Sequence, residues 1–496
     1  MDTLLQYVAC STQRYVDGMP KTERKIFGQF FTSVATARFM ASLFHIRADK
    51  DTLFILVAGA GSGILSAAVV ERLQKEKHLR RIHLVCYETD AHVMPVLRRN
   101  LEFLSRSSVI PLDYDLREEN YILSQQMEYN AHLGANKEPQ KYDLIIGNPP
   151  YKKVGKDAPE ASAMKDVCYG APNLYALFAA MGMFNMVEGA EMVYIIPRSW
   201  TSGAYFKAFR KRLFESCSLE HIHLFVSRNK VFDKESVLQE TMILKVRKGA
   251  SATGSVTITT SESSRDFSCL TLHTSAVQNI VRGDDQYVYL ITNADEEQAV
   301  QRVSTCKKTL KDIGLQMRTG LTVDYREKTD LRSSIEPGAI PLIFPHHIKN
   351  GKVIFPIGKE NEYLHTSRAA LKQKNMNYLF VKRFTAKEES RRLQCGVYLS
   401  RKHPNHELIS TQNKINFIGG LKELSDCIVY GLYVIFNSTL YDTYYRIMNG
   451  STQVNSTEVN SIPVPELSVI ESMGKTLLQA RDMSEKMCNQ ILAAYV

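Results

Sequence analysis

A motif near residue 150 combines an amide, two prolines and an aromatic ring. Residues 148–151 read Asn-Pro-Pro-Tyr and follow an apolar run at 142–147, which predicts a buried strand ending in a sharp turn. The Asn148 side chain and the Pro149 carbonyl are acceptors that could hold an exocyclic amino nitrogen, whose delocalised lone pair makes it a poor nucleophile. Tyr151 offers a flat face for a planar base. The motif indicates methyl transfer to such a nitrogen, although a Pro-rich turn with a core tyrosine explains it equally well in isolation.

A glycine loop lies upstream of this motif. Residues 52–70 carry no charge and are long enough for a membrane span, but Gly59, Gly61 and Gly63 interrupt the run. The pattern instead predicts a strand at 53–58, a turn and a helix from residue 64, as in a nucleotide-binding βαβ unit. Such a loop brings backbone close to a ligand and exposes amides at a helix N-terminus. A dehydrogenase uses a related loop, so the loop alone does not fix the function.

Two acids follow at expected strand ends. The run at 81–88 predicts a strand ending in Glu88, where a carboxylate suits ribose hydroxyls. A third strand is expected near 108–112, delivering Asp113, and the strand before Asn148 is the fourth. Because the carboxyl ends of parallel strands meet at one edge, we expect these groups around one cleft. Either acid alone could equally be a solvated strand end.

This order of motifs resembles the gamma-class N6-adenine DNA methyltransferases, the modification enzymes of type II restriction-modification systems, and is closest to those of the PstI type. The resemblance covers nearly the whole chain. It implies an α/β fold, with a Rossmann-like S-adenosylmethionine-dependent methyltransferase sheet followed by a C-terminal α+β target recognition domain. It also implies the cofactor contacts: Phe31 and Thr32 line the pocket, Gly59, Gly61 and Gly63 approach the methionine part, Glu88 holds the ribose, and Asp113 contacts the cofactor's adenine ring.

The same resemblance assigns the target site. Asn148 and Pro149 would orient the amino group of an adenine flipped out of double-stranded DNA, with Tyr151 and Phe232 stacking on the base. Phe232 ends an apolar run, where a core position is the ordinary alternative. The chain departs from the family at 57–58, where Val-Ala replaces the usual acid and proline. This departure leaves open a catalytically impaired, DNA-binding relative.

The C-terminal half is basic and contains no second glycine loop. A Ser/Thr/Gly-rich stretch at 249–268 predicts a boundary between a catalytic domain at 1–250 and a DNA target recognition domain at 251–496. Segments 318–324 and 449–455 look like parts of such recognition domains. A group of basic residues is expected on the DNA surface, although a solvated charged face explains each of them equally well. They are Lys382, Arg383, Lys387, Arg391 and Arg392.

Composition agrees with a nucleic-acid partner. The net charge is +10, which favours a polyanion. The nine cysteines form no Cys-x-x-Cys pair and no cluster with histidine, so neither a disulfide framework nor a metal site is expected. With no export signal, we expect a cytoplasmic protein. No acidic nuclease cluster is evident, so any cognate restriction endonuclease would be encoded separately.

Other methyltransferase classes fit less well. The glutamine N5-methyltransferases that act on release factors share Asn-Pro-Pro-Tyr but lack a large basic C-terminal domain. A cytosine C5 enzyme needs a nucleophilic cysteine, usually after proline, and none of the nine cysteines follows a proline. The sequence therefore predicts a site-specific adenine N6-methyltransferase.

Overall fold

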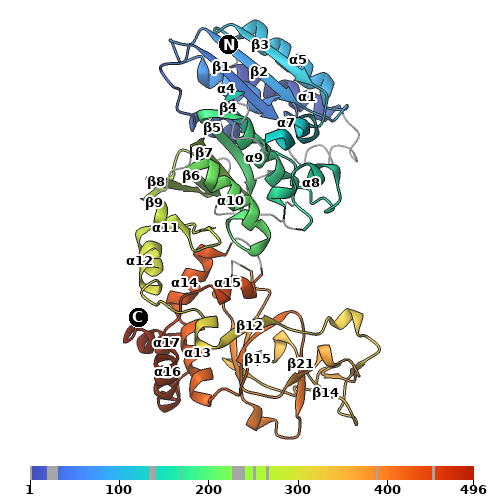
Figure 1. Ribbon diagram of the computed structural model, residues 1–496, viewed down its shortest axis with the longest axis vertical. Helices are drawn as coiled ribbons and strands as arrows, with labels where there is room; N and C mark the ends of the chain where they lie inside the picture. Colours follow the sequence, from blue (N-terminus) through green and yellow to red (C-terminus); the bar gives the residue numbers. More distant parts are fainter. Residues whose placement is uncertain are drawn as a thin grey trace. The chain divides into compact units, whose positions relative to one another are not determined.

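The computed structural model describes residues 3–18, 32–132, 141–168, 170–225, 241–249, 253–263, 267–386, 389–449 and 453–496. The chain divides into two compact units, Met1–Asn293 and Ala294–Val496 (Figure 1). The boundary therefore lies beyond the position expected near residue 250. The reason is that two strands after residue 250 join the sheet of the first unit, although the Ser/Thr/Gly-rich stretch at 249–268 suggested a domain boundary.

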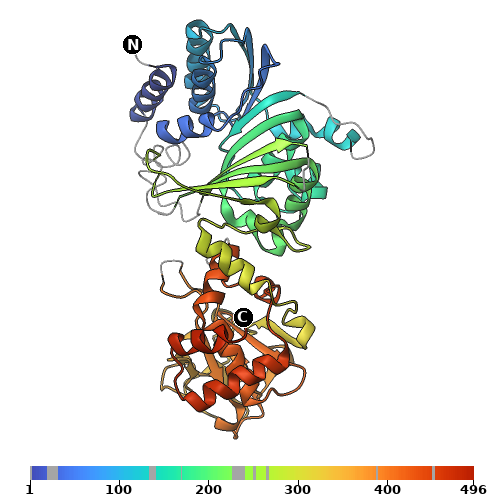
Figure 2. The same ribbon diagram turned by 90° about the vertical axis from the view of Figure 1, so that its left-hand side faces the viewer.

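Nine strands of the first unit form one mixed sheet in the order β3-β2-β1-β4-β5-β7-β6-β8-β9. The strands from β3 to β5 run parallel, whereas β7 is antiparallel to both β5 and β6. Figure 2 shows the yellow-green strands β8 and β9 continuing the green part of the sheet. The strand bounds are β1 Thr52–Ala58, β2 Arg81–Tyr87, β3 Leu112–Arg117, β4 Tyr142–Gly147, β5 Met186–Pro197, β6 Cys217–Phe225, β7 Thr241–Lys248, β8 Ser255–Ser261 and β9 Thr271–Ala276.

The strand order reverses between β1 and β4, which are hydrogen-bonded neighbours. In an open α/β sheet such a reversal opens a crevice outside the carboxyl ends of the strands. β4 is buried along its whole length, as expected for a central strand covered on both faces. The crevice is therefore the first place to look for a ligand site.

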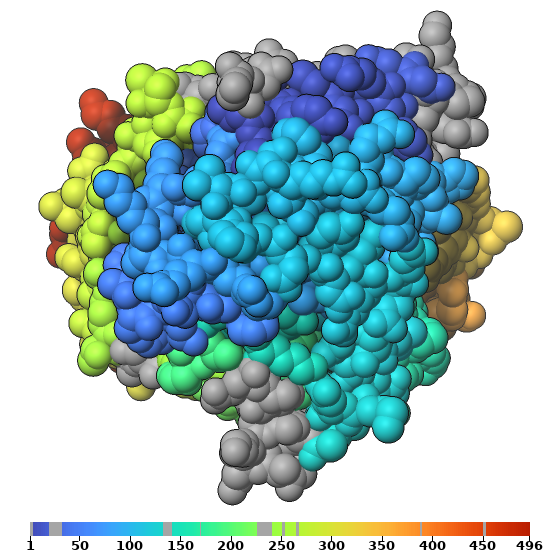
Figure 3. Space-filling model, turned by 90° about the horizontal axis from the view of Figure 1, so that it is seen from above, coloured from blue at the N-terminus to red at the C-terminus, as the bar shows by residue number. Residues whose placement is uncertain are grey.

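Helices α1 (Leu4–Asp17), α3 (Val34–Ser42), α4 (Ile64–Leu73) and α5 (Met94–Ser107) cover one face of the sheet. Their apolar residues join a core cluster with Leu53, Ile55 and Val57 of β1. In Figure 3, α1 in dark blue lies beside the light-blue segment containing α5, where Tyr7 stacks on Phe103. The uncharged run at 52–70 is thus β1, the glycine loop and part of α4. Among the described residues, no helix is long and apolar enough to cross a membrane.

Helix α9 (Leu174–Asn185) covers the opposite face of the sheet. A Cβ at Gly182 would lie 2.9 Å from the Met192 sulfur, so a larger residue there would force the Met192 side chain or the helix to shift. The other elements of this unit are α6 Tyr121–Ser124, α7 Gln126–His132, α8 Pro159–Ala163, η2 Lys165–Val167, η3 Arg198–Thr201, η4 Ala204–Phe206, α10 Lys207–Ser216, α11 Val277–Ile280, β10 Val281–Arg282 and β11 Tyr287–Val288.

The second unit combines two small sheets with a group of helices. The sheet orders are β12-β22-β19-β20-β16-β15 and β13-β17-β14-β21-β18. Their bounds are β12 Leu315–Thr319, β13 Leu331–Arg332, β14 Ile340–Ile343, β15 Ile348–Lys349, β16 Lys352–Val353, β17 Tyr363–Leu364, β18 Gln373–Lys374, β19 Tyr378–Lys382, β20 Cys395–Tyr398, β21 Leu408–Thr411 and β22 Ile415–Gly420.

The helices of this unit are α12 Ala294–Val303, α13 Asp426–Phe436, α14 Thr439–Met448, α15 Ser456–Asn460, α16 Leu467–Ala480 and α17 Glu485–Ala493, and its short 3-10 turns are η6 Lys311–Ile313, η7 Asp324–Arg326, η8 Pro345–His347, η9 Ala369–Leu371 and η10 Ser400–Lys402. Helices α13 and α16 touch backbone to backbone. A Cβ at Gly431 would lie 1.8 Å from the Ile470 carbonyl oxygen, and one at Gly474 would lie 1.7 Å from the Cys427 carbonyl oxygen. Glycine at these two positions therefore allows α13 and α16 to pack in direct backbone contact.

Candidate active site

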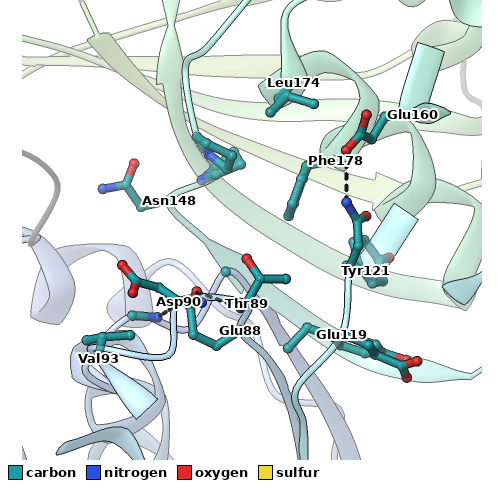
Figure 4. Close-up of a pocket in the computed structure, with 16 residues that line it drawn as sticks. Glu88, Thr89, Asp90, Val93, Glu119, Tyr121, Asn148, Glu160, Leu174 and Phe178 are labelled. Carbon is teal, nitrogen blue, oxygen red and sulfur yellow. Dashed lines mark hydrogen bonds between the residues drawn. The ribbon is translucent and has the colours of Figure 1, made fainter. Parts of the chain in front are cut away.

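A cavity of about 500 Å³ opens at the carboxyl ends of β1, β2, β3 and β4 (Figure 4). Its volume lies in the usual range for small-molecule sites. The expected residues Gly59, Gly61, Glu88, Asn148 and Pro149 all line it. The structure thus brings the glycine loop, one acid and the start of the Asn-Pro-Pro-Tyr motif to a single pocket.

The glycine loop needs its glycines for two different reasons. Gly59, Gly61 and Gly63 have φ angles of 72°, 56° and 88°, which residues with a Cβ rarely adopt. Gly59 and Gly61 face the cavity, but Gly63 does not line it. Gly63 precedes α4, and a Cβ there would lie 3.2 Å from Leu97 of α5. Gly63 therefore shapes the turn and the helix packing, whereas the other two glycines face the ligand space.

Glu88 follows β2 and is held by backbone amides. One oxygen, Oε2, accepts from the Gly61 N–H over 2.8 Å, and Oε1 accepts from the N–H groups of Thr89 and Asp90 over 2.8 and 2.9 Å. Each carboxylate oxygen can accept more than one hydrogen bond, so Glu88 retains capacity for a ligand hydroxyl. The side chain is therefore fixed in place while it faces the cavity (Figure 4).

Asp113 lies away from this pocket, which corrects its expected position at a strand end. It is the second residue of β3, opposite His83 of β2, and its exposed side chain is hydrogen-bonded to the His83 ring. The strand starts later than the apolar run at 108–112 suggested. The residues beyond its carboxyl end, Glu119, Asn120 and Tyr121, line the cavity instead.

The Asn148 side chain makes two identified contacts. Its Nδ2 donates to the Thr32 hydroxyl over 3.3 Å, and its Oδ1 lies 2.9 Å from the Tyr151 hydroxyl. Thr32 does not itself line the cavity, but it contacts Asn148, which does. Tyr151 does not line the cavity; its hydroxyl also lies 3.2 Å from the Ile195 carbonyl oxygen. Burial raises the pKa of Tyr151 well above its usual range, so this hydroxyl remains a donor at physiological pH.

Apolar and aromatic side chains that the sequence argument had not singled out form the far wall. Phe178 and Leu174 come from α9, and Tyr121 packs at 5.7 Å from the Phe178 ring. Figure 4 shows Phe178 and Tyr121 on the side away from Asn148. Asn120 donates to Glu160 of α8 over 2.9 Å beside them. This wall is suited to a flat ring. The sequence signal for it was the Asn-Tyr pair three residues beyond β3.

Residues 57–58, where Val-Ala replaces the acid and proline usual in the family, have buried side chains. Val57 and Ala58 are both fully buried, and Val57 belongs to the core beneath the helices. The acids at the cavity are instead Glu88, Asp90, Glu119 and Glu160. A positively charged ligand group would therefore find carboxylates on the walls of the pocket.

Three expected site residues lie outside the described residues, namely Phe31, Phe232 and Lys387. Their roles remain expectations from the family resemblance.

The basic group of the second unit does not form one surface. Arg392 is 0% exposed and donates to Asn449 and Thr385, while its backbone N–H donates to Asp442. A fully buried guanidinium cannot contact DNA, so this expectation was wrong. Arg391 is mostly buried and lies 2.7 Å from the Glu485 carboxylate.

The two remaining basic residues are half-buried at the end of β19. Lys382 donates to Gln394 over 2.9 Å, and Arg383 donates to the Asn413 carbonyl and to Gln453, both over 3.1 Å. The Arg383 guanidinium also lies 5.5 Å from the ring centroid of Phe384, which is exposed. Among the described members of the basic group, Lys382 and Arg383 are the ones that a polyanion can reach.

One further group in the second unit has the composition of a metal site. His346, His347 and Glu362 bring their ligand atoms within 4.8 Å of one another. His347 Nδ1 accepts from the Phe344 N–H over 2.9 Å, so Nε2 carries the proton and donates to Glu362 over 2.6 Å. Because both ring nitrogens of His347 are engaged, this group is a buried polar network rather than a ligand set.

Comparisons with known proteins agree with this architecture. The Eco57I restriction-modification methylase family model matches residues 69–232. The chain is 32% identical over 469 residues to type II methyltransferase M.PstI of Providencia stuartii, covering 92% of this chain and 90% of that protein. It is also 32% identical to M.BsuBI of Bacillus subtilis, covering 91% and 90%.

Solved structures agree in fold. The type IIL restriction-modification enzyme MmeI in complex with DNA superposes with a TM-score of 0.50 at 14% identity, covering 96% of this chain and 69% of that one. The DrdV–DNA complex has a TM-score of 0.52 at 11% identity, covering 95% and 59%. The expected fold class is confirmed: a methyltransferase-type α/β sheet followed by a mixed α and β unit.

Proposed function

Because the chain belongs to the type II methyltransferases of restriction-modification systems, we propose that it methylates the N6 amino group of adenine at a specific site in duplex DNA. The observation that carries the proposal is the shared cavity of the glycine loop, Glu88 and the Asn148-Pro149 pair. The glycine loop and acid suit a nucleoside cofactor, and the acceptors suit an amino group. One pocket thus provides for both partners of a methyl transfer.

The residues around the cavity fit S-adenosylmethionine. When bound, this cofactor supplies an electrophilic methyl group. Gly59 and Gly61 allow close approach of its methionine part, Glu88 accepts from ribose hydroxyls, and Tyr121 with Phe178 contacts the adenine ring. We therefore assign the contact with the adenine ring of the cofactor to residues that follow β3, such as Tyr121, and not to Asp113.

The acceptors at β4 orient the target. Asn148 Oδ1 and the Pro149 carbonyl accept the two N–H hydrogens of the adenine amino group, which favours a more tetrahedral nitrogen with an available lone pair. These hydrogen bonds become stronger as the nitrogen becomes tetrahedral. They therefore lower the barrier to methyl transfer and do more than tighten the binding of the adenine. The methylated nitrogen then loses its proton to solvent, so no general base is needed.

The target adenine must leave the helix to reach this cavity, at a cost of a few kcal/mol. Tyr151 and Phe232 receive the extruded base, while the unit from Ala294 onward reads the DNA sequence. MmeI and DrdV, similar in fold, were solved with DNA. In this proposal the enzyme works in the cytoplasm and protects DNA from a separately encoded restriction endonuclease.

The test is a transfer assay with labelled S-adenosylmethionine, mixed-sequence duplex DNA and nucleoside analysis by mass spectrometry. We expect N6-methyladenine at one recurring sequence. Label in cytosine, or in glutamine of a release factor offered in parallel, would overturn the assignment. Absence of both label and cofactor binding would identify an impaired relative.

A further inference from the structure

Three lysines lie within the five residues that follow the Asn-Pro-Pro-Tyr motif. Lys152, Lys153 and Lys156 are all exposed, and Asp157 is the only acid in segment 152–158. Within the described part of the chain, no carboxylate pairs with any of the three ammonium groups, and the Lys153 ammonium lies 4.9 Å from the ring centroid of Tyr205. The segment therefore carries a net positive charge.

This segment is held firmly beside the cavity. The Leu174 N–H donates to the Lys152 carbonyl and the Val154 N–H donates to the Pro172 carbonyl, both over 2.9 Å. Lys153 and Asn173 form an antiparallel bridge between these bonds. Leu174 begins α9 and itself lines the cavity. The positions of the lysine backbones are thus fixed relative to the pocket.

A row of aromatic rings links the lysines to the motif. The Tyr151 ring lies 6.3 Å from Tyr175, Tyr175 stacks at 5.9 Å on Phe206, and Phe206 lies 5.0 Å from Tyr205. Tyr205 carries the Lys153 ammonium on its face. The charge at Lys153 is therefore positioned through packed rings as well as through the backbone.

We propose that Lys152, Lys153 and Lys156 anchor the phosphate groups that flank the target nucleotide in duplex DNA. The inference rests on the proposed function and adds a DNA contact within the catalytic unit itself. Phosphate contacts fix register without reading sequence, and a base can be delivered to a fixed cavity only if its own backbone is held beside that cavity. Lysine suits this role as a compact charge with three donors.

The test compares two double variants of the full-length protein. Lys152→Gln with Lys153→Gln removes two of the proposed contacts. Lys75→Gln with Lys77→Gln is the matched control. Both residues are exposed and follow the C-terminal end of α4, near the amino ends of the strands and away from the cavity at their carboxyl ends. Fluorescence anisotropy across a salt series measures the affinity for two duplexes, one that contains the sequence that the enzyme methylates and one that lacks it. Calorimetry measures the affinity for S-adenosylmethionine.

We expect the Lys152/Lys153 variant to bind both duplexes about tenfold more weakly at low salt. Its slope of log affinity against log salt should be shallower by about two, since each phosphate contact contributes about 0.9. Cofactor affinity should not change, and the control should match wild type. An unaltered slope overturns the phosphate anchor while wild-type methylation still supports the proposed function. A wild type that neither binds nor methylates duplex DNA overturns both.

Discussion

The Tyr151 hydroxyl lies 2.9 Å from Asn148 Oδ1 and 3.2 Å from the Ile195 carbonyl oxygen. A hydroxyl has one proton, so it can donate fully to only one of these two acceptors. The amide oxygen of Asn148 has two lone pairs, so donation from Tyr151 fixes the orientation of this oxygen and still leaves capacity for the target amino group. Donation to the Ile195 carbonyl instead would leave the Asn148 side chain without this support.

Tyr151→Phe separates this hydrogen bond from the ring. The variant keeps the flat face but loses the group that orients Asn148. We therefore expect single-turnover methyl transfer to slow by up to about tenfold, the equivalent of a hydrogen bond of up to about 1.4 kcal/mol. Tyr151→Ala should slow it further because the stacking face is lost as well. Equal rates for the Phe variant and wild type would show that the hydroxyl does not position Asn148.

Asn148→Ala removes the proposed acceptor itself. We expect the rate of methyl transfer to fall by about 10²–10³-fold, as for loss of one preorganised polar group at a transition state. Binding of cofactor and DNA should persist. Thr32→Val is the control: it removes a partner of the Asn148 amide but no substrate acceptor, so it should cost less. A larger loss in Thr32→Val than in Asn148→Ala would move the chemistry away from Asn148.

Val57→Asp restores the acid that the related enzymes usually have before the glycine loop. Because Val57 is fully buried in the core of the first unit, we expect the carboxylate to lower the free energy of unfolding by several kcal/mol instead of tightening cofactor binding. Thermal melts and calorimetry on the same sample measure both effects, and Val57→Ala separates lost packing from buried charge. Unchanged stability with tighter cofactor binding would show that the side chain reaches the pocket.

Lys382 and Arg383 are the accessible members of the basic group among the residues that the structure describes. Replacing both with Gln should weaken binding to specific and nonspecific duplexes alike and flatten the salt dependence by up to about two. Cofactor affinity should be retained. Arg392→Met is the contrasting variant: it breaks a buried network, so it should lower the melting temperature. An unaltered salt slope in the Lys382/Arg383 variant would exclude these two residues from the DNA surface.

Because of two largely buried histidines, we expect the first unit to lose stability at acidic pH. Burial, first among the causes, lowers the pKa of His221 to about 4 and that of His223 to about 3, against about 6.5 in the unfolded chain. The unfolded chain therefore binds more protons as pH falls below about 6.5, and stability declines from there to about pH 3. Urea titrations across this range should give falling midpoints. His221→Gln should reduce the decline; an identical decline would assign it to other groups.

The central strands could be predicted from the sequence because their signals are local. Gly59, Glu88 and Asn148 each follow a mostly apolar run, and such runs become buried parallel strands whose ends meet. The family resemblance drawn from those motifs is confirmed by relatives aligned over nearly the whole chain.

The exceptions depend on positions in the sheet that no local pattern reveals. β3 lies at an edge and alternates polar with apolar residues, so the neighbouring apolar run at 108–112 was the stronger signal and misplaced Asp113. β8 is rich in Ser and Thr, yet pairs in parallel with β6. Arg392 has the charge of a surface residue, but its partners Asp442 and Asn449 lie about fifty residues away in sequence and only the fold brings them together.

Gly147 lies directly against the Tyr194 ring of the neighbouring strand. It precedes Asn148 at the end of β4, and a Cβ there would lie 2.6 Å from the ring of Tyr194 on β5. A side chain at this position would have to push the Asn-Pro-Pro-Tyr backbone away from β5. We therefore expect positions 147 and 194 to covary among relatives: any residue larger than glycine at the first should be accompanied by loss of the aromatic ring at the second.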